Sequence, residues 1–451
     1  MCGVAGVFGQ SEAASWTCEA LFAQQHRGQD SCGLCASDGE RLHLFKGMGL
    51  VKEAVPPSLL KELPGHGAIG HVRYPTQGEA TLPNAQPFLF VKDGTPLFAL
   101  ASNGDITNLP ELREEIEKRS YRFDGTNDGE VIAKAIGSWA FDDGMGIEAA
   151  IAKWMRVGMG AYSTLLLTPT EFYAFRDPHG FRPLSVGEKD GAAVLTSETV
   201  GLDILRARFI EHIPAGAIRR WGPGGPRSSV GAVSKKLDHC IFEHIYFARP
   251  DSYVFGEKVF EVRRRIGEAL ASGDTVQADA VVPIPDSANY IGMGYANARN
   301  IPIVMGLVRN HYVGRTFIAP VQLMRDETVR LKFNPLPGFF EGQRVVLVDD
   351  SIVRGTTIRK LVRMLRENGA KEVHLRIGSP PIRYSCYYGI DTPDRKYLIA
   401  AERSPEQVAD VLSADTLRYL TLEGLHSTVS KPGDYCYACF TGDYPAGKKR
   451  A

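Results

Sequence analysis

Two apolar runs with an amphipathic helix between them occur in the second half of the chain, and this order decides its fold class. Val345–Val348 is an apolar run, and Val373–Ile377 carries an apolar side chain at every second position; both contain β-branched residues, which favours strands. Between them, residues 358–365 carry apolar side chains at the i, i+3, i+4, i+7 spacing of one helix face. Strand, helix and strand in succession predict a parallel sheet of the α/β class, and the similar run Ala280–Ile284 adds a further strand.

The first half has a different pattern, with short apolar segments between Gly, Pro and Asn turns. Gly67–Arg73 and Tyr162–Leu167 are examples, and they predict antiparallel strands with a few helices. The run Gly222–Ser234 is crowded with turn-forming residues and has no periodicity, which is typical of a domain boundary. We therefore expect two domains, residues 2–230 and residues 231–451.

Composition excludes several classes of protein. The chain has 451 residues, 44% of them hydrophobic and 23% charged, which is typical of a globular protein with a sizeable core. Its 52 Lys and Arg residues balance 52 Asp and Glu residues, so no net charge attracts nucleic acid or an anionic membrane. No apolar run reaches the roughly 20 residues of a membrane span, and no secretory signal opens the chain. We expect a cytoplasmic protein with neither a nucleic-acid partner nor a membrane partner.

An acidic pair directly follows the apolar run at 345–348. Asp349 and Asp350 stand at the carboxyl end of the predicted strand, where open α/β sheets bind their ligands. Ser351 and the sequence Gly355-Thr356-Thr357 then lead into the predicted helix. Backbone N–H groups and hydroxyls at a helix N-terminus favour a phosphate, and neighbouring carboxylates suit a ribose diol or its Mg²⁺. The stretch predicts a site for a phosphorylated sugar.

The amino terminus holds a candidate nucleophile. Cys2 follows the initiator methionine, whose removal would leave a thiol and a free α-amine on one residue, so that the amine can act as base for the thiol. Asn103 and Gly104 offer an amide and an unhindered N–H to an oxyanion. Arg73 suits a carboxylate, and Asp128 suits an ammonium group. Together these residues describe a pocket for an α-amino acid.

Several segments of the first half resemble the glutaminase domain of the N-terminal-nucleophile (Ntn) amidotransferases. The segments are Met1–Val7, Gln25–Ser31, Gly70–Tyr74 and Asn103-Gly104. The resemblance implies that Cys2 is the nucleophile, that Asn103 and Gly104 form the oxyanion hole, and that Arg73 and Asp128 bind the carboxylate and ammonium groups of glutamine. The sequence departs from the family pattern at Pro75, Ser102 and Asp105, where Ser, His and Asn are usual.

The acidic-pair stretch resembles the phosphoribosyl pyrophosphate (PRPP) motif of type I phosphoribosyltransferases. Four further segments extend the resemblance to the amidophosphoribosyltransferases over nearly the whole chain: Arg176–Leu184, Phe242–Ser252, Pro283–Ser287 and Tyr312–Ile318. This resemblance implies an α+β and α/β architecture, an Ntn-hydrolase αββα sandwich followed by a type I phosphoribosyltransferase parallel-sheet domain. It also implies that Mg²⁺ is held by Ser287, Asp349 and Asp350, and that PRPP phosphate is held by the loop Ser351–Thr357.

Basic residues that suit a pyrophosphate group lie between Arg309 and Asn334. Within this segment, Arg315 and Lys332 are candidate PRPP ligands. The segment has the composition of a lid that folds over a bound substrate. We expect its closure to activate glutamine hydrolysis.

Four of the eight cysteines are candidate metal ligands. Cys436 and Cys439 form a C-x-x-C pair, and Cys240 and Cys386 are two more cysteines of the second half. Four thiolates suit either Zn²⁺ or a [4Fe–4S] cluster, and the residue types alone do not choose between them. The resemblance implies the cluster, because these cysteines match the ligand positions of an iron–sulfur subgroup of the amidophosphoribosyltransferases. Three other cysteines are interpreted as small buried hydrophobic residues: Cys18, Cys32 and Cys35.

The resemblance implies one reaction. Ammonia released from glutamine attacks C1 of PRPP and gives 5-phosphoribosylamine, glutamate and pyrophosphate, the first committed step of de novo purine synthesis. It further implies one Mg²⁺ and one [4Fe–4S] cluster per subunit, a homotetramer, and inhibition by purine nucleotides. Two alternatives remain open: an amidotransferase that aminates a sugar phosphate, which has no use for the acidic-pair loop, and a PRPP-binding regulatory protein, which does not need Cys2.

Overall fold

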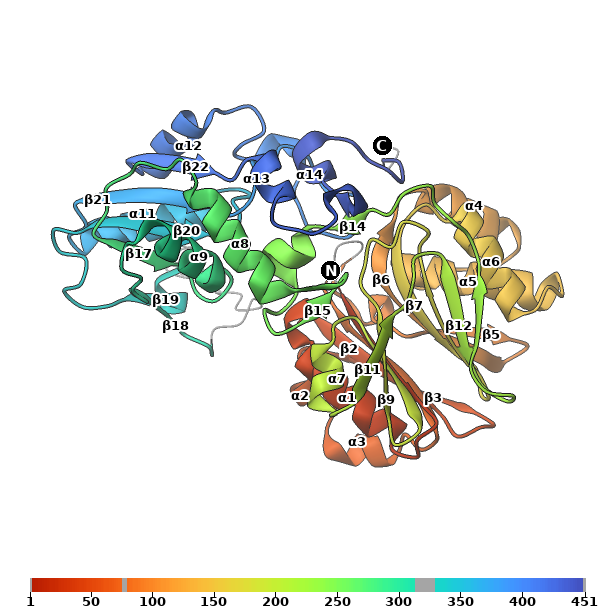
Figure 1. The fold of residues 1–451 in the computed structure, drawn as a ribbon. Coiled ribbons are helices and arrows are strands. Elements are labelled where there is room, and N and C mark those ends of the chain that lie inside the picture. Colours follow the sequence, from red (N-terminus) through yellow and green to blue (C-terminus); the bar gives the residue numbers. More distant parts are fainter. Residues whose placement is uncertain (1, 75–78, 313–328, 449–451) are drawn as a thin grey trace.

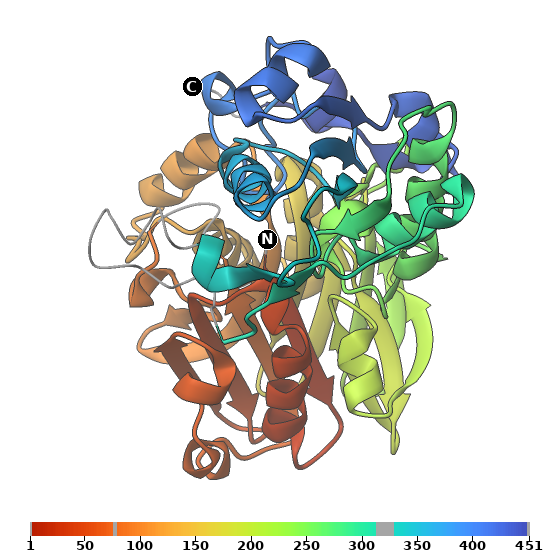
Figure 2. The same ribbon diagram turned by 90° about the vertical axis from the view of Figure 1, so that its left-hand side faces the viewer.

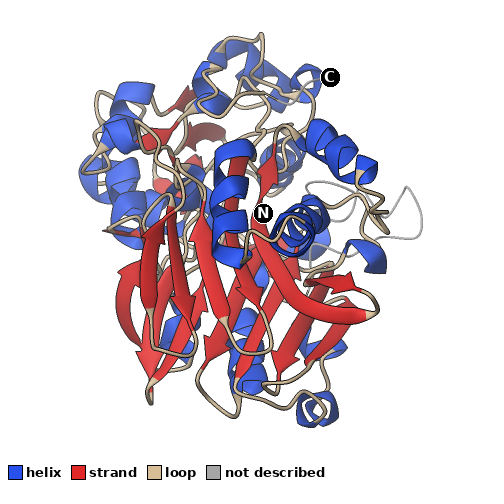
Figure 3. Ribbon diagram, turned by 90° about the vertical axis from the view of Figure 1, so that its right-hand side faces the viewer, coloured by secondary structure: helices blue, strands red, loops and turns tan. Residues whose placement is uncertain are grey.

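The computed structural model describes residues 2–74, 79–312 and 329–448. Its amino-terminal half consists of two antiparallel sheets, with strand orders β11-β9-β10-β1-β4-β2-β3 and β13-β12-β8-β7-β6-β5 (Figures 1 and 3). The strands of the first sheet are β1 (Gly3–Phe8), β2 (Ser31–Ser37), β3 (Leu42–Met48), β4 (Gly67–Arg73), β9 (Ser185–Lys189), β10 (Ala192–Thr196) and β11 (Arg208–His212). Those of the second sheet are β5 (Phe88–Lys92), β6 (Thr95–Ile106), β7 (Gly160–Leu167), β8 (Phe172–Arg176), β12 (Ala217–Trp221) and β13 (Arg227–Val230).

The two sheets face each other across a layer of small and apolar side chains. Val4 and Ile69 of the first sheet and Ala101 and Leu165 of the second belong to this layer, and all four are fully buried. Helices cover the outer faces: α1 packs on β1 and β4, and α5 packs on β5 and β6. The helices of this half are α1 (Ala13–Ala23), α2 (Val51–Ala54), α3 (Pro57–Lys61), α4 (Leu109–Lys118), α5 (Asp128–Gly137), α6 (Ile147–Val157) and α7 (Val200–Ile204). The expected αββα sandwich is confirmed.

The carboxyl-terminal half is built on a parallel sheet with the strand order β17-β20-β21-β22. Its strands are β17 (Ala280–Pro283), β20 (Arg344–Asp349), β21 (Glu372–Ile377) and β22 (Thr416–Tyr419). The expected strand, helix and strand are confirmed, with α11 at Thr356–Glu367 between β20 and β21. Further helices of this half are α8 (Val259–Ala271), α9 (Asn289–Arg299), α12 (Pro405–Leu412), α13 (Leu422–His426) and α14 (Ala438–Thr441).

Short strands complete this half of the molecule. They form the hairpins β15 (Tyr253–Val254) with β16 (Glu257–Lys258) and β18 (Leu307–Arg309) with β19 (Phe333–Pro335), and the parallel pair β14 (His239–Cys240) with β23 (Tyr435–Cys436). In the part of the chain that the structure describes, no helix is both long enough and apolar enough to cross a bilayer.

The run Gly222–Ser234 differs from the sequence expectation in one respect. Instead of being irregular throughout, it includes β13, which pairs with β12 across a turn at Gly224 and Gly225. Both glycines have positive φ values, 89° and 81°, which side chains of other residues rarely allow. β13 is the last strand of the amino-terminal sheets, and the boundary between residues 230 and 231 stays a prediction.

The two halves meet around the start of the chain. The amino terminus lies between the first sheet and the carboxyl-terminal half in both ribbon views (Figures 1 and 2). A buried cluster joins Ala161 and Phe181 of the first half to Tyr388, Ala438 and Ala446 of the second. The rings of Phe181 and Tyr388 stack with centroids 4.4 Å apart. The two halves therefore share a buried interface.

Candidate functional site

Cys2 is held by backbone and side-chain groups from three other segments. Its exposed fraction is 7%. Its N–H donates to Asn103 Oδ1 at 3.1 Å, and its Sγ donates to the carbonyl of Tyr74 at 3.5 Å. Its own carbonyl accepts a hydrogen bond from Arg27 Nε at 2.9 Å. The thiol thus lies directly before the first residue of β1, next to the chain segments that the sequence associated with glutamine.

A small pocket gathers the predicted amino-terminal residues. Cys2, Arg73, Gly104 and Asp128 line it. Other residues complete the lining: Tyr74, Gln86, Ser102 and Asn127. Burial lowers the pKa of Arg73, whereas the neighbouring Cys2 and Asp128 act in the opposite direction. A cationic side chain and a carboxylate therefore lie close to one thiol, as an amino-acid substrate requires.

Asn103 and Gly104 lie inside strand β6, not in a turn. They pair with Ser163 and Tyr162 of β7, and a Cβ at Gly104 would lie 1.8 Å from the carbonyl oxygen of Ala161. Only glycine fits this close approach of two strands. Asn103 Nδ2 is buried and has no hydrogen-bond partner within the described residues. A buried donor without a partner is unusual, and an oxyanion in the pocket would satisfy it.

The acidic pair lies at the carboxyl edge of the parallel sheet, as the sequence predicted. β17 and β20 are neighbouring parallel strands, so the residues that follow them meet at one edge. The Ser287 hydroxyl, after β17, lies near the carboxylate of Asp350, after β20, and acts against the rise in the pKa of that carboxyl. Ser351 Oγ donates to Asp350 Oδ1, at 2.7 Å. The three predicted Mg²⁺ ligands, which include Asp349, are therefore together.

Burial disfavours the charged form of the two carboxylates at this edge, so that a bound cation would stabilise them. It raises the pKa of both Asp349 and Asp350, and the neighbouring Asp350 charge adds to the increase at Asp349. The positive charge of Lys332 acts in the opposite direction at Asp349, so this predicted PRPP ligand is close by. Two carboxylates and a hydroxyl are oxygen donors of the kind Mg²⁺ prefers.

The predicted phosphate loop enters α11 directly. Gly355 precedes the helix with φ of 76°, and Thr356 and Thr357 begin it with exposed side chains. Arg309 Nη1 donates to Asp286 Oδ2 at 2.8 Å, which places the start of the basic segment beside Ser287. Arg315 lies outside the described residues.

Comparison with known proteins agrees with both sites. Residues 79–203 match the glutamine amidotransferase domain family, and residues 257–377 match the phosphoribosyl transferase domain family. The amidophosphoribosyltransferase of Methanothermobacter thermautotrophicus is 42% identical over 98% of this chain and 94% of its own length. The chain belongs to the amidophosphoribosyltransferase family. The full-length match disfavours both alternatives, the sugar-phosphate aminating enzyme and the PRPP-binding regulator.

Other amidophosphoribosyltransferases give the same result. The protein of Synechococcus elongatus is 44% identical over 98% of this chain and 91% of its own length. The solved structure of the Bacillus subtilis glutamine PRPP amidotransferase, complexed with ADP and GMP, is 40% identical and covers 99% of this chain and 98% of its own, with a TM-score of 0.92. Glutamine amide transfer and phosphoribosyl transfer are therefore combined in this one chain, as in the rest of the family.

The four candidate cluster cysteines of this amidophosphoribosyltransferase converge from three segments. Cys240 and Cys436 are partners in the parallel pair of β14 and β23, and Cys439 follows on α14. Cys386 Sγ accepts a hydrogen bond from the backbone N–H of Tyr388 at 3.3 Å. Burial raises the pKa of Cys240, Cys436 and Cys439, and the charges of the other cysteines in the group increase each shift.

Three other cysteines lie apart from this group. Cys32 and Cys35 are buried in β2, as expected for small hydrophobic residues, and Cys18 on α1 is half-buried. Across the described ranges, no group of three or more His, Cys, Asp or Glu side chains is arranged to hold a metal ion.

The sequence did not single out two kinds of supporting residue. Gln86 receives the N–H of Ser102 on Oε1 at 2.7 Å and returns Nε2 to its carbonyl at 3.2 Å, which fixes the strand next to Asn103. Arg27 donates to the carbonyl of Cys2 and pairs with the carboxylates of Glu198 and Glu243. Arg27 lies in the segment Gln25–Ser31, which resembles the family, but its role could not be read from the sequence. The neighbouring Gly28 allows close packing of this segment, because a Cβ there would lie 2.5 Å from the backbone nitrogen of Arg73.

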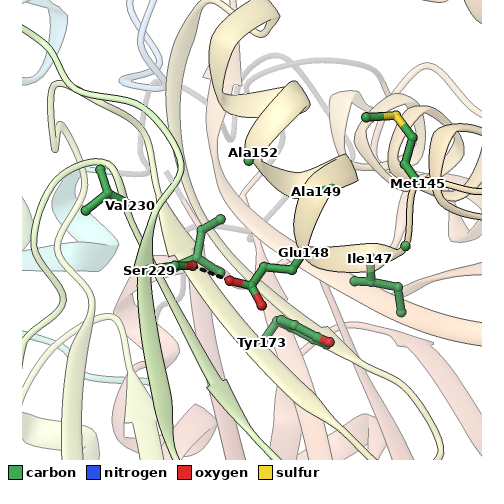
Figure 4. Close-up of a pocket in the computed structure, with 10 residues that line it drawn as sticks. Met145, Ile147, Glu148, Ala149, Ala152, Tyr173, Ser229 and Val230 are labelled. Atoms are coloured by element: carbon green, nitrogen blue, oxygen red, sulfur yellow. Dashed lines mark hydrogen bonds between the residues drawn. The ribbon is translucent and has the colours of Figure 1, made fainter.

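A larger pocket, of about 530 Å³, contains none of the predicted site residues. It lies between α6 and the strands β8, β12 and β13, where Ser229 Oγ donates to Glu148 (Figure 4). Apolar side chains including Met145, Ile147 and Val230 form much of its wall. The size of a pocket therefore does not identify the chemistry of this protein.

Proposed function

We propose that the thiol of Cys2 attacks the side-chain amide carbon of glutamine in the small pocket. The new S–C bond creates an oxyanion, whose collapse expels ammonia and leaves a γ-glutamyl thioester that water hydrolyses to glutamate. After removal of the leading methionine, the α-amine of Cys2 accepts the thiol proton and donates it to the leaving nitrogen. The N–H groups of Asn103 and Gly104 stabilise the oxyanion, while Arg73 and Asp128 hold the α-carboxylate and the α-ammonium.

The released ammonia then attacks C1 of PRPP. The N–C1 bond forms, the C1–O bond to pyrophosphate breaks, and a proton leaves the nitrogen, which gives 5-phosphoribosylamine. Thr356, Thr357 and the backbone from Ser351 to Gly355 hold phosphate at the start of α11. Mg²⁺, held by Ser287, Asp349 and Asp350, would supply charge neutralisation for pyrophosphate. Lys332 and Arg315 are proposed to add positive charge.

We also propose one [4Fe–4S] cluster per subunit on Cys240, Cys386, Cys436 and Cys439. The convergence of four half-buried cysteines supports it. A single Zn²⁺ ion needs all four sulfurs about 2.3 Å from one point, whereas a four-iron cluster takes each thiolate at a different iron. Its role would be structural, because the cysteines join the carboxyl-terminal segment to β14.

Regulation and assembly follow the family in this proposal. The Bacillus subtilis relative was solved with ADP and GMP, and another solved relative is described as the allosteric regulatory enzyme of purine biosynthesis. We propose a cytoplasmic homotetramer that purine nucleotides inhibit. Activation of glutamine hydrolysis by closure of the 309–334 segment over PRPP stays a prediction, because residues 313–328 of this segment lie outside the described residues.

The meeting of Cys2, Arg73, Gly104 and Asp128 in one pocket carries the proposal. The neighbouring Asn103 supports it, because its Oδ1 accepts from the N–H of Cys2 and its buried Nδ2 has no hydrogen-bond partner within the described residues. The decisive variant is Cys2→Ala, assayed for phosphoribosylamine synthesis with glutamine and, separately, with ammonia. We expect glutamine-dependent synthesis to be lost and ammonia-dependent synthesis to remain. The half-buried Cys18 provides the matched control, and Cys18→Ala is expected to keep both activities. Glutamine-dependent synthesis that survives in Cys2→Ala would refute the assignment.

A further inference from the structure

A fully buried group of charges lies directly behind Cys2. Arg27, in the short helix Gln25–Arg27, has no exposed surface, and its Nε donates to the carbonyl of Cys2 at 2.9 Å. Its other nitrogens contact two buried carboxylates, Glu198 and Glu243. Arg27 therefore touches the nucleophile residue through the main chain, while the remainder of its guanidinium is anchored elsewhere.

The second anchor belongs to the other half of the molecule. Glu243 begins the short helical segment Glu243–Phe247, after β14, and is also fully buried. Its two oxygens accept from Arg27 Nη2 at 2.8 Å and from Arg27 Nη1 at 3.0 Å. Arg182 Nη1 lies 3.5 Å from the same carboxylate. A bidentate pair of this kind fixes both the position and the orientation of the guanidinium plane.

The first anchor, Glu198, is held within a separate set of contacts. It accepts hydrogen bonds from the N–H of Arg249 at 2.9 Å and from Ser252 Oγ at 2.7 Å, and His26 Nε2 lies 2.8 Å away. Together, the two carboxylates outweigh the effect of burial and raise the pKa of Arg27. The cation is therefore retained in the interior.

The segment that carries Glu243 is tied in turn to the phosphoribosyl site. Arg263 of α8 is buried, and it donates to the carbonyls of His244 at 2.8 Å and Ala248 at 2.7 Å. The negative charge of Asp350 acts on Arg263 and partly offsets the lowering of its pKa by burial. Contacts thus run from Cys2 through Arg27 and Glu243 to the neighbourhood of the acidic pair.

We propose that Arg27 is a positioning residue for glutamine hydrolysis and that Glu243, from the phosphoribosyl half, holds it in the productive position. The proposal rests on the proposed role of Cys2 as nucleophile. Its physical basis is that the hydrogen bond from Arg27 orients the first peptide group, and with it the thiol and the α-amine. A misplacement of about 1 Å at a reacting group can cost about 100-fold in rate.

Two variants test this role without removing a group that contacts glutamine. Glu243→Gln removes the charge that anchors Arg27, and Arg27→Lys keeps a cation but loses the planar fork and the Nε donor. In both, we expect kcat for glutamine hydrolysis to fall about 10- to 100-fold, while KM for glutamine and ammonia-dependent synthesis stay unchanged. Glu243→Asp keeps the charge with a shorter reach, and it should show the same selective loss to a smaller extent.

The matched control is Asp274→Asn. Asp274 also forms a buried ion pair, with Arg376, but this pair lies within the carboxyl-terminal half and contacts neither Cys2 nor Arg27. The Asp274→Asn variant should be less stable than the unchanged protein, but it should show no selective loss of glutamine hydrolysis. Thermal unfolding of each variant sets an assay temperature at which all of them are folded.

If the Glu243 and Arg27 variants lose glutamine-dependent and ammonia-dependent activity equally, the pair is only structural. If glutamine hydrolysis is unchanged in these variants, the pair does not position Cys2. The Cys2→Ala variant separates this outcome from a failure of the proposed function. If Cys2→Ala loses glutamine-dependent synthesis while Glu243→Gln, Glu243→Asp and Arg27→Lys keep it, the positioning role is wrong and the nucleophile assignment stands. If Cys2→Ala keeps glutamine-dependent synthesis, the proposed function itself is wrong.

Discussion

Cys240 and Cys436 are direct neighbours on two short parallel strands, β14 and β23, although almost two hundred residues of chain lie between them. The strand that carries Cys240 begins the carboxyl-terminal half, and the strand that carries Cys436 lies close to its end. Both thiols are flanked by further cysteines of the same half, Cys386 and Cys439. A cluster bound here would join the two ends of the carboxyl-terminal half.

The first prediction concerns the metal content. Purified protein is expected to contain about four iron and four sulfide ions per chain, as a [4Fe–4S] cluster requires. Cys436→Ser should lower the iron content and the thermal stability together, whereas Cys35→Ser, a buried cysteine outside the group, should leave the iron content unchanged. Zinc in place of iron, or no metal at all, would contradict the cluster without affecting the enzyme assignment.

The second prediction concerns Asp349. Asp349→Asn removes a carboxylate that is proposed to hold Mg²⁺ where charge develops on pyrophosphate, so synthesis should fall about 100-fold or more with either nitrogen donor. Hydrolysis of glutamine without PRPP should persist. Asp279→Asn is the matched control, because Asp279 pairs with Arg344 at the opposite end of the same two strands. An Asp349→Asn variant with normal ammonia-dependent synthesis would exclude the proposed role.

The third prediction concerns the oxyanion hole. Asn103→Ala removes the buried Nδ2 donor, and a loss of one such donor lowers kcat by about 10²- to 10³-fold. The KM for glutamine should change little, because Arg73 and Asp128 remain. Glutaminase kinetics measure both quantities. A rise in KM with unchanged kcat would assign Asn103 to substrate binding instead.

The fourth prediction concerns acid stability. The Arg376 guanidinium and the Tyr295 hydroxyl lower the pKa of Asp274 from 3.8 to about 2, against the effect of burial. The folded state therefore binds this proton less readily than the unfolded state, and the stabilisation is complete above about pH 4 and is lost as the pH falls towards 2.

The Asp274→Asn variant tests this direction of the change in stability with pH. It leaves Arg376 without its buried partner, so the free energy of unfolding should fall by about 3 kcal/mol at neutral pH. Denaturant titrations of both proteins between pH 7 and pH 3 should show the difference shrinking as the pH falls. A difference that grows in acid would mean that the pair does not stabilise the fold as an ionised carboxylate.

The phosphoribosyl site could be predicted because its signals are local. The strand that ends at Asp349, the loop with Gly355 and the stripe of apolar residues on α11 are adjacent in sequence, so period and spacing are sufficient. The meeting of Ser287 with Asp350 follows from the parallel pairing of β17 and β20. The glutamine pocket required the family resemblance, because Asn103-Gly104 by itself more often indicates a turn than the interior of a strand.

The contacts between the two halves could not be predicted in this way. Arg27 and Glu243 lie far apart in the sequence, and an isolated Arg or Glu more often indicates an exposed side chain than a buried pair. β14 and β23 have two residues each, which is too short for any periodicity. Such contacts depend on how complete domains pack, and only the folded structure contains that information.

The central claim is that nitrogen released at Cys2 reaches C1 of PRPP within the same molecule. The most direct measurement supplies glutamine labelled with nitrogen-15 in the side-chain amide, together with PRPP and an excess of unlabelled ammonium at neutral pH, and determines the isotope in phosphoribosylamine trapped as it forms. The account predicts product that carries mainly the glutamine nitrogen despite the excess of ammonium. Product with the isotope ratio of the bulk ammonium would contradict it.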